Sequence, residues 1–111
     1  MITRIFESSV VPGGMDGLAN WLAKNAWAPD SSSASAITGR PGALGGALYR
    51  QLDATQRKIY IVTHWVDEES IAAHVGAEWR TRGVSDPEES QYFTGSKSFS
   101  HYVRVNGTGS V

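Results

Sequence analysis

The sequence contains no cysteine. This absence excludes disulfide bonds, thiolate metal ligands and a cysteine nucleophile together. An excess of one charge is also missing, because 10 lysine and arginine residues stand against 11 aspartate and glutamate residues. No nucleic-acid partner and no anionic membrane surface is therefore expected. The cysteine-free composition is typical of a cytoplasmic protein.

Long apolar runs are absent as well. The N-terminal stretch MITRIFESSVVPGG has no apolar signal core, and no uninterrupted apolar run is long enough to cross a bilayer. A chain of 111 residues has room for one hydrophobic core. We expect one domain over residues 1–106, followed by a polar tail, residues 107–111, that frays because it has nothing to bury.

The pattern of apolar residues predicts six elements. Alternating β-branched residues indicate strands, and apolar residues spaced by three and four from Met15 indicate a first helix. Asp67 is placed to cap a second helix, which Gly76 either ends or kinks. The polar turn DATQ joins the two middle strands into a hairpin. In chain order the elements are a strand 2–11, a helix 15–24, strands 43–52 and 57–66, a helix from 67, and a strand 98–105.

The order strand, helix, strand, strand, helix, strand is that of the ferredoxin-like α+β fold. Its antiparallel sheet carries both helices on one face and leaves the other face open. Phe6, Tyr60, Val62 and Tyr102 predict an apolar character for the open face. A symmetric partner is the common way to cover such a face, so a homodimer is expected.

Two segments fit neither helix nor strand. Residues 26–42 are rich in serine, proline and glycine, which indicates a long loop with at most one short helical turn around 31–37. Loops of this length in a small domain are often functional, so we interpret this one as a lid. The stretch SDPEES is interpreted as a break before the last strand.

The stretches GRPGALGGALYRQ and IYIVTHWVDEESIAAH resemble the core of the antibiotic biosynthesis monooxygenase family. The shared pattern is Pro41-Gly42 before the second strand, Trp65 closing the third, Asp67 as a cap, and His74 nine residues after the tryptophan. The resemblance covers residues 2–105 and implies a dimeric α+β barrel with a ligand pocket between sheet and helices. Members of this family oxidise polyketide phenols with O₂ and no bound cofactor, others degrade heme, and many have no known reaction.

Both catalytic branches of the family differ from this chain at specific positions. The heme-degrading branch has an asparagine, a tryptophan and an iron-ligating histidine at the positions of Glu7, His74 and Gly83. Glycine cannot ligate iron, so heme is not expected to bind in that manner. The polyketide-oxidising branch has an asparagine and a tyrosine at the positions of Ile61 and Ile71, and only its tryptophan is retained. We therefore expect no cofactor, and the spacing of the three histidines predicts no metal site.

The catalytic candidates are His74, Glu7 and Trp65. His74 lies at the edge of the inward face of the second helix, and an imidazole there can take a proton from a phenol. In the family's register the Glu7 carboxyl points into an apolar pocket, which would raise its pKa. The alternatives are a histidine at the surface edge, a one-residue slip that turns Glu7 outward, and a purely structural Trp65.

The substrate-binding candidates surround these three residues. Alternation along the third strand places Thr63 on the same face as Trp65 and turns His64 toward the dimer partner. If the second helix continues through Gly76, Glu78 lies one turn beyond His74 and orients it. For each candidate the alternative is plain packing. The candidates are Tyr49, Thr63, Trp21, Asn25, Ile71 and Glu78.

Three functions follow from these residues. The first is a cofactor-independent monooxygenase of secondary metabolism that oxidises an aromatic or polyketide-like phenolic substrate with O₂, with His74 or Glu7 as the base. The second is a non-oxidative cyclase, isomerase or decarboxylase of a polyketide-type intermediate, using His74 with Tyr49. The third is a non-catalytic ligand-binding dimer in which His74 and Glu7 are solvated.

Overall fold

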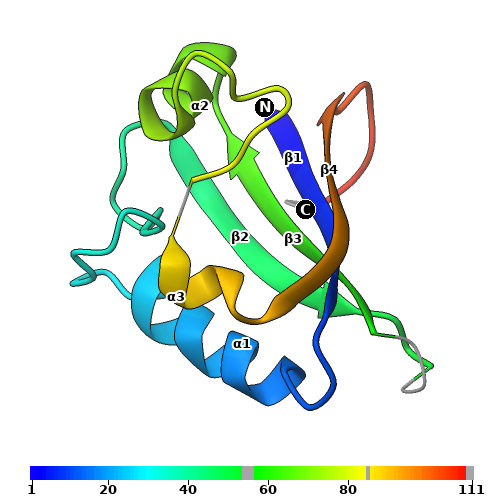
Figure 1. Cartoon of the computed structure of the whole chain (residues 1–111). Coiled ribbons are helices and arrows are strands. Elements are labelled where there is room, and N and C mark those ends of the chain that lie inside the picture. Colours follow the sequence, from blue (N-terminus) through cyan, green and yellow to red (C-terminus); the bar gives the residue numbers. More distant parts are fainter. Residues whose placement is uncertain (54–56, 85, 110–111) are drawn as a thin grey trace.

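A computed structural model describes residues 1–53, 57–84 and 86–109 of the chain (Figure 1). Most of the predicted DATQ turn and the last two residues of the predicted tail lie outside these ranges. The elements are β1 (Ile2–Val10), α1 (Met15–Leu22), the π-helix η1 (Ala23–Trp27), β2 (Ala43–Arg50), β3 (Lys58–Trp65), α2 (Glu68–Val75), α3 (Pro87–Ser90) and β4 (Phe93–Val103).

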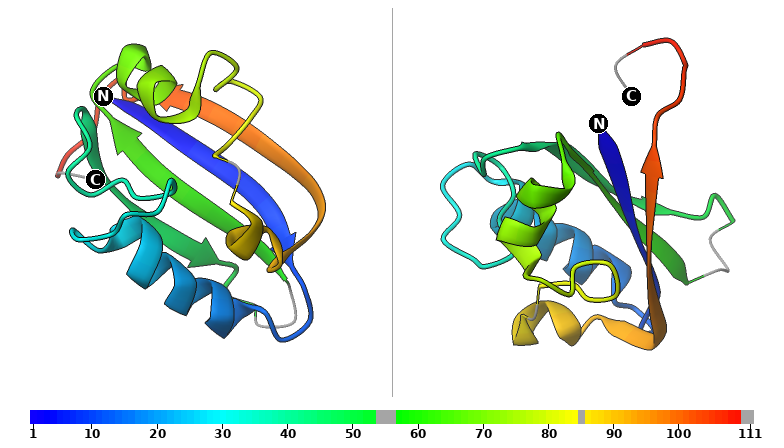
Figure 2. Two further views of the ribbon diagram at one scale, coloured as in Figure 1. Left: turned by 60° about the vertical axis from the view of Figure 1, so that its left-hand side comes forward. Right: turned by 90° about the horizontal axis from the view of Figure 1, so that it is seen from above.

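The four strands form one antiparallel sheet in the order β2-β3-β1-β4. Figure 2 shows the helices gathered on one side of this sheet. Strand order, antiparallel pairing and helix placement together confirm the predicted ferredoxin-like α+β fold. Among the described residues, no helix is both long and apolar enough to cross a membrane.

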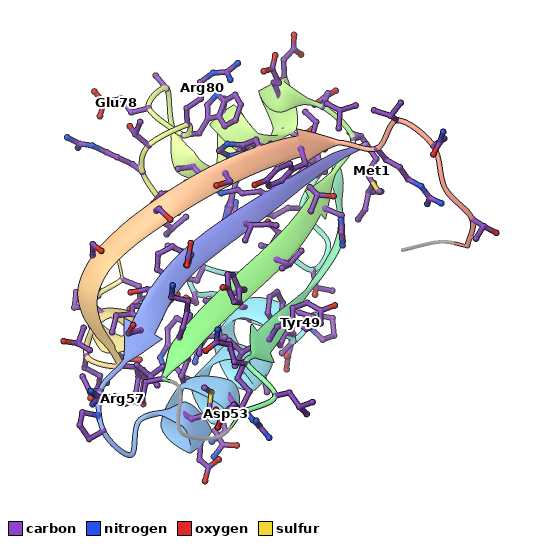
Figure 3. All side chains as sticks on the ribbon, turned by 90° about the vertical axis from the view of Figure 1, so that its right-hand side faces the viewer. Met1, Tyr49, Asp53, Arg57, Glu78 and Arg80 are labelled. Carbon is purple, nitrogen blue, oxygen red and sulfur yellow. The ribbon has the colours of Figure 1, made fainter. Side chains whose placement is uncertain are left out.

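Strand alternation decides which side chains face the helices. Phe6 on β1 pairs with Ile61 on β3 and with Phe99 on β4, and all three line the space between sheet and helices. The expectation that Phe6 faces the open side was therefore wrong. Tyr60 and Tyr102 alternate to the opposite face, as predicted, and Figure 3 shows the strands passing in front of the helices from that side.

The helix side of the sheet is packed as two apolar clusters instead of one continuous core. One lies under α1 and η1 and contains Leu18, Leu22 and Ile59. The other lies under α2 and contains Trp65 and Ile71. Trp27 packs against both clusters, and the lining of one cavity includes side chains from both.

The structure explains why position 42 of the Pro41-Gly42 pattern is a glycine. Its φ of +82° lies in the left-handed region, and a Cβ there would lie 1.9 Å from Oγ of Ser70 on α2. The Gly42 carbonyl accepts a hydrogen bond from the Val66 amide, which joins the start of β2 to the end of β3. Glycine at this position lets the first turn of α2 approach the sheet closely. The predicted cap is also present, since the Asp67 carboxylate accepts a hydrogen bond from the Ser70 amide.

Two elements differ from the sequence prediction, and at a third the structure decides between two alternatives. The first helix continues beyond Leu22 as the π-helix η1, a form often found at functional sites. Gly76, with a φ of +117°, ends α2, which settles the alternative that the pattern left open. SDPEES is only partly a break, because Asp86 caps the short helix α3, after which β4 begins at Phe93.

Candidate functional site

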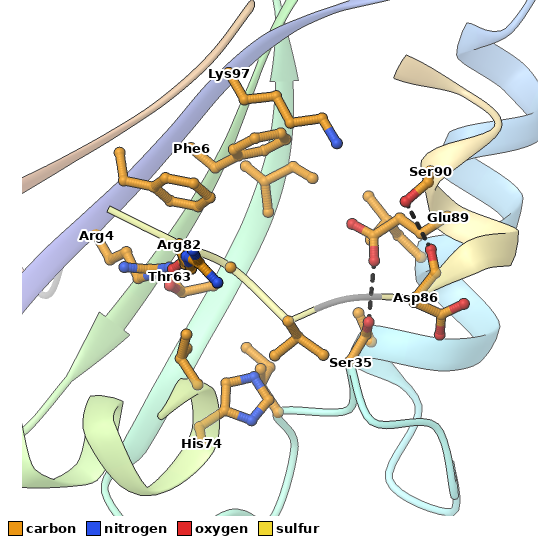
Figure 4. Close-up of a pocket in the computed structure, with 18 of the residues that line it drawn as sticks. Arg4, Phe6, Ser35, Thr63, His74, Arg82, Asp86, Glu89, Ser90 and Lys97 are labelled. Atoms are coloured by element: carbon orange, nitrogen blue, oxygen red, sulfur yellow. Dashed lines mark hydrogen bonds between the residues drawn. The ribbon is translucent and has the colours of Figure 1, made fainter. Parts of the chain in front are cut away.

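The candidate site is a cavity of about 390 Å³ between the sheet and the helices (Figure 4). Its middle is walled by apolar and aromatic side chains, among them Phe6, Trp27 and Phe99. Polar groups line much of the rest, and most of them gather at two ends of the cavity. One end carries Arg4, Thr63, His74 and Arg82, the other carries Ser35, Asp86, Glu89 and Ser90, and Lys97 lies beside Phe6. A cavity with apolar walls and converging polar groups is the usual form of a small-molecule site.

His74, Trp65 and Thr63, all predicted for the site, line the cavity. The His74 ring stacks on Trp65, with centroids 5.4 Å apart and planes inclined by 28°. The indole N–H of Trp65 donates to the Thr63 hydroxyl at 2.9 Å. This bond and the stacking fix Trp65, which in turn fixes the plane of the imidazole. Trp65 is itself 1% exposed, so it serves both as core residue and as cavity wall.

The Nδ1 atom of His74 is buried and has no hydrogen-bond partner among the described residues. Burial, with smaller contributions from Arg40 and Arg4, lowers the pKa of His74 from 6.5 to about 4. The ring is therefore neutral at pH 7. A neutral imidazole with a buried, unpaired nitrogen is a group that a ligand can satisfy.

Arg4 is the charged residue that the sequence analysis missed on β1. It is only 6% exposed, and its guanidinium donates to the carbonyls of Trp79 and Arg82 and to Nε2 of His101. Burial lowers the pKa of Arg4 to about 10, so it stays charged at pH 7. Strand alternation puts Arg4 on the same face as Phe6, and the sequence analysis had turned that face away from the helices, so the arginine was not recognised as an inward residue.

Glu89 was also missed, because SDPEES was interpreted as a break without functional residues. The Glu89 carboxylate accepts a hydrogen bond of 3.0 Å from Ser35. Burial raises the pKa of this carboxyl, and the nearby Asp86 raises it further, against the Ser35 hydrogen bond and Lys97. Asp86 followed by Pro87 is a helix-start signature that was available in the sequence.

The structure contradicts the predicted placement of Glu7 and Tyr49. Glu7 pairs with Tyr60 in the β1–β3 ladder, and its carboxylate forms an ion pair of 2.9 Å with Lys58 on the open face. Counting from Pro12 put Glu7 in the pocket, but in this chain the inward position belongs to its neighbour Phe6. Tyr49 also pairs with Tyr60, is 55% exposed, and lies on that same open face (Figure 3).

Four further candidates do not line the cavity either. Glu78 lies beyond the end of α2, where its carboxylate pairs with Arg82 at 2.9 Å and does not orient His74. Ile71 is fully buried in the cluster around Trp65. The other two lie along the first helical segment, where Trp21 donates to Glu88 and Asn25 donates to the Trp21 carbonyl.

The long loop contributes to the cavity through Ser35 and Ile37. Two serine hydroxyls tie the loop to α3: Ser33 donates to Asp86 at 3.2 Å, and Ser35 donates to Glu89 at 3.0 Å. A turn at residues 34–35 replaces the helical turn proposed for this segment. In residues 1–53, 57–84 and 86–109, no group of histidine and carboxylate side chains has the arrangement of a metal site.

The chain matches no protein-family model and no curated protein. It does match solved structures over nearly its whole length. A putative antibiotic biosynthesis monooxygenase from Nitrosomonas europaea has a TM-score of 0.66 at 13% identity, covering 96% of this chain and 100% of the other. The chain has the fold of the antibiotic biosynthesis monooxygenases. The same fold is found in a putative family member from Chloroflexus aurantiacus, with a TM-score of 0.60 at 19% identity over 97% of this chain and 96% of the other.

The heme-degrader MhuD from Mycobacterium tuberculosis, solved with two hemes in its active site, also shares this fold. Its TM-score is 0.60 at 24% identity, over 98% of this chain and 100% of that chain. The iron-ligand position inferred from sequence falls on Gly83, where a Cβ would lie 2.9 Å from the Phe99 ring. A histidine has no room there, and Nε2 of His101 is occupied by Arg4. The residues of this cavity therefore do not fit heme ligation of that type.

Proposed function

We propose that the protein is a cofactor-independent monooxygenase that oxidises an aromatic or polyketide-like phenolic substrate with O₂ in secondary metabolism. The observation that carries this proposal is that the imidazole of His74 lines a cavity with aromatic walls and has no protein hydrogen-bond partner at Nδ1 among the described residues. Because the pKa of His74 is lowered to about 4, the ring reaches the substrate as a neutral proton acceptor. The fold shared with putative antibiotic biosynthesis monooxygenases supports the same class of reaction.

His74 can act as the base despite its low pKa, because the bound substrate changes the charge around the imidazole. The positive charges of Arg4 and Arg40 oppose an imidazolium, and the same charges stabilise a phenolate. A phenolate in the cavity would in turn raise the pKa of His74, because opposite charges favour each other. Proton transfer from the phenol to the His74 imidazole thus produces an ion pair in a site that shields it from water.

The substrate anion then supplies the electrons. In the oxidation of a methylene group to a carbonyl, one atom of O₂ enters the substrate and the other leaves as water. The two C–H bonds provide all four electrons and both hydrogens of that water, so no external reductant is required. The protein contributes orientation, exclusion of water and the proton held by His74. Trp65 forms the wall that holds the imidazole in place.

Oxygen consumption tests the proposal. Metal-stripped protein is supplied with anthrone substrates, and dissolved O₂ is followed together with quinone formation. We expect uptake without added cofactor, and a fall of at least about 100-fold in kcat for His74→Ala and His74→Gln. His64→Gln is the matched control, because His64 contacts Thr3 on the open face. Full activity in the His74 variants would exclude this residue as the base.

The cavity also favours a second candidate, a non-oxidative acid/base reaction on a polyketide-type intermediate. The observation behind it is that one cavity holds a neutral imidazole, His74, and a carboxyl group of raised pKa, Glu89. The pair predicted from the sequence for this chemistry was His74 with Tyr49, but these two residues lie on opposite sides of the sheet. Product formed under argon at the aerobic rate would establish this reaction in place of the oxygenase.

We further propose that the protein is a cytoplasmic homodimer and that a second copy covers the open face of the sheet. Tyr49 and Tyr102, each 55% exposed, lie on that face on the two edge strands β2 and β4, so large exposed aromatic side chains stand at both sides of the face that the second copy would cover. Dimers of this kind bury the same patch of both subunits.

A further inference from the structure

The most unusual charge in the molecule is the buried guanidinium of Arg4. All three of its protein partners, the carbonyls of Trp79 and Arg82 and Nε2 of His101, are neutral acceptors at 2.5, 2.6 and 2.7 Å. Phe99 covers the guanidinium at 4.5 Å from its ring centroid. The neutral contacts fix the orientation of the cation without neutralising its charge.

No carboxylate among the described residues forms an ion pair with Arg4. The acidic residues nearby are engaged elsewhere: Glu78 pairs with Arg82, and Glu68 pairs with Arg80. Burying a cation without a counter-charge is costly even after relaxation. Arg4 lines the cavity proposed for the substrate, so an anionic ligand there would supply the missing charge.

The donors that remain free on Arg4 define the shape of this ligand. A guanidinium has five N–H groups. Both hydrogens of Nη1 and one of Nη2 are used by the protein partners, which leaves Nε–H and the second N–H of Nη2. Nε and Nη2 share one edge of the guanidinium, and N–H groups along such an edge suit two adjacent oxygens. Figure 4 shows Arg4 with Arg82 and Thr63 at the cavity wall, on the same side as Phe6.

We infer that Arg4 is the anion-binding residue of the cavity and selects planar aromatic substrates whose ionised hydroxyl stands beside a carbonyl oxygen. This inference rests on the proposed function and names its substrate class. The phenolate and carbonyl oxygens occupy the fork of Arg4, while the rings lie between the aromatic walls that include Phe6 and Phe99. Arg4 touches the substrate at the oxygen that bears the charge, and His74 accepts the proton.

The test uses a probe that binds but is not oxidised. Wild-type protein is titrated with 1-hydroxyanthraquinone, which has a hydroxyl beside a carbonyl, and with anthraquinone, which lacks the hydroxyl. Ionisation of the probe is read from its absorption band. We expect the hydroxy probe to bind at least about tenfold more tightly than anthraquinone, with its pKa lowered by at least about one unit in the complex. Equal affinities and an unchanged probe pKa would overturn the inference without any variant.

Variants then assign the effect to Arg4. Arg4→Met is expected to remove the preference for the hydroxy probe and to keep the affinity for anthraquinone, which reports an intact cavity. Arg4→Lys is expected to be intermediate, because lysine keeps the charge and loses the fork. Arg57→Met, at an exposed position next to β3, is the control. A preference that persists in both Arg4 variants would overturn the assignment.

A carboxylate probe separates the two oxyanion classes. Competition by naphthalene-2-carboxylate at an affinity equal to that of the hydroxy probe would overturn the selectivity for hydroxy-ketones and leave Arg4 as a carboxylate site.

Measurements of oxygen uptake distinguish a failure of this inference from a failure of the proposed function. Arg4-dependent binding without uptake would refute only the oxygenase, and uptake with an unchanged KM in Arg4→Lys would refute only the anion site.

Discussion

The imidazole of His74 lies against the indole of Trp65 at a centroid distance of 5.4 Å, and its Nδ1 has no protein partner among the described residues. Trp65 is held in turn by the Thr63 hydroxyl. Trp65 covers one face of the imidazole, and burial of the ring is the main reason that the pKa of His74 falls to about 4. Packing around His74 thus keeps the proposed base neutral.

His74 should make folding stability depend on pH. Its pKa is about 4 in the folded protein against 6.5 as the ordinary value, so the unfolded chain binds the proton first as the pH falls. The contribution of His74 to the free energy of unfolding is complete above about pH 6.5 and is lost progressively as the pH falls to about 4. Because water reaches part of the ring, we expect a loss of at most about 2 kcal/mol. Urea unfolding of wild type and His74→Gln across this range should show a smaller loss in the variant; parallel curves would contradict the prediction.

Glu89 should have the opposite pH dependence. Burial raises the pKa of its carboxyl, so the folded state favours the neutral form and stability is lost as the pH rises through that pKa. Glu89→Gln keeps the shape and removes the charge, so the Tm of the variant relative to wild type should increase from pH 4 to pH 8. The matched control is Glu7→Gln, which removes an exposed ion pair with Lys58 and should change stability by about 0.2–1 kcal/mol without a gain at high pH.

Gly42 should tolerate no side chain. Alanine there combines a φ of +82° with a Cβ 1.9 Å from Oγ of Ser70, so we expect Gly42→Ala to cost about 2–4 kcal/mol of unfolding free energy. Gly39→Ala separates the two causes, because Gly39 has a φ of +86° and no atom within 4 Å of the added Cβ. It should cost about 1 kcal/mol. Equal losses in thermal unfolding of the two variants would show that the contact with Ser70 contributes nothing.

The open face should control association. A charge at Tyr49 would have to be buried in the proposed dimer, so Tyr49→Asp is expected to shift the protein from dimer to monomer in sedimentation velocity. Asn20→Asp adds the same charge to an exposed position on α1, on the helix side, and should leave the dimer intact. A wild-type protein that sediments as a monomer at micromolar concentration would rule out the dimer directly.

The sequence by itself determined the order of the elements, the face of β3 that carries Trp65 and Thr63, and the cap at Asp67. Each of these is set by neighbours a few residues apart: alternation along a strand, apolar spacing along a helix, or a side chain that reaches its own backbone. His74 was found in the same way, through its distance from Trp65 along a continuous strand and helix.

Only the tertiary structure decided which charged groups share the cavity. Arg4, Ser35, His74 and Glu89 come from a strand, a loop and two helices that are far apart in the chain, and no local pattern measures their separation. A shift of one residue along a strand reverses the side it faces, which is why a count from Pro12 placed Glu7 in the pocket. The carboxyl groups of the cavity come instead from Asp86 and Glu89, because α3 is held against the long loop by hydrogen bonds that only the folded chain can form.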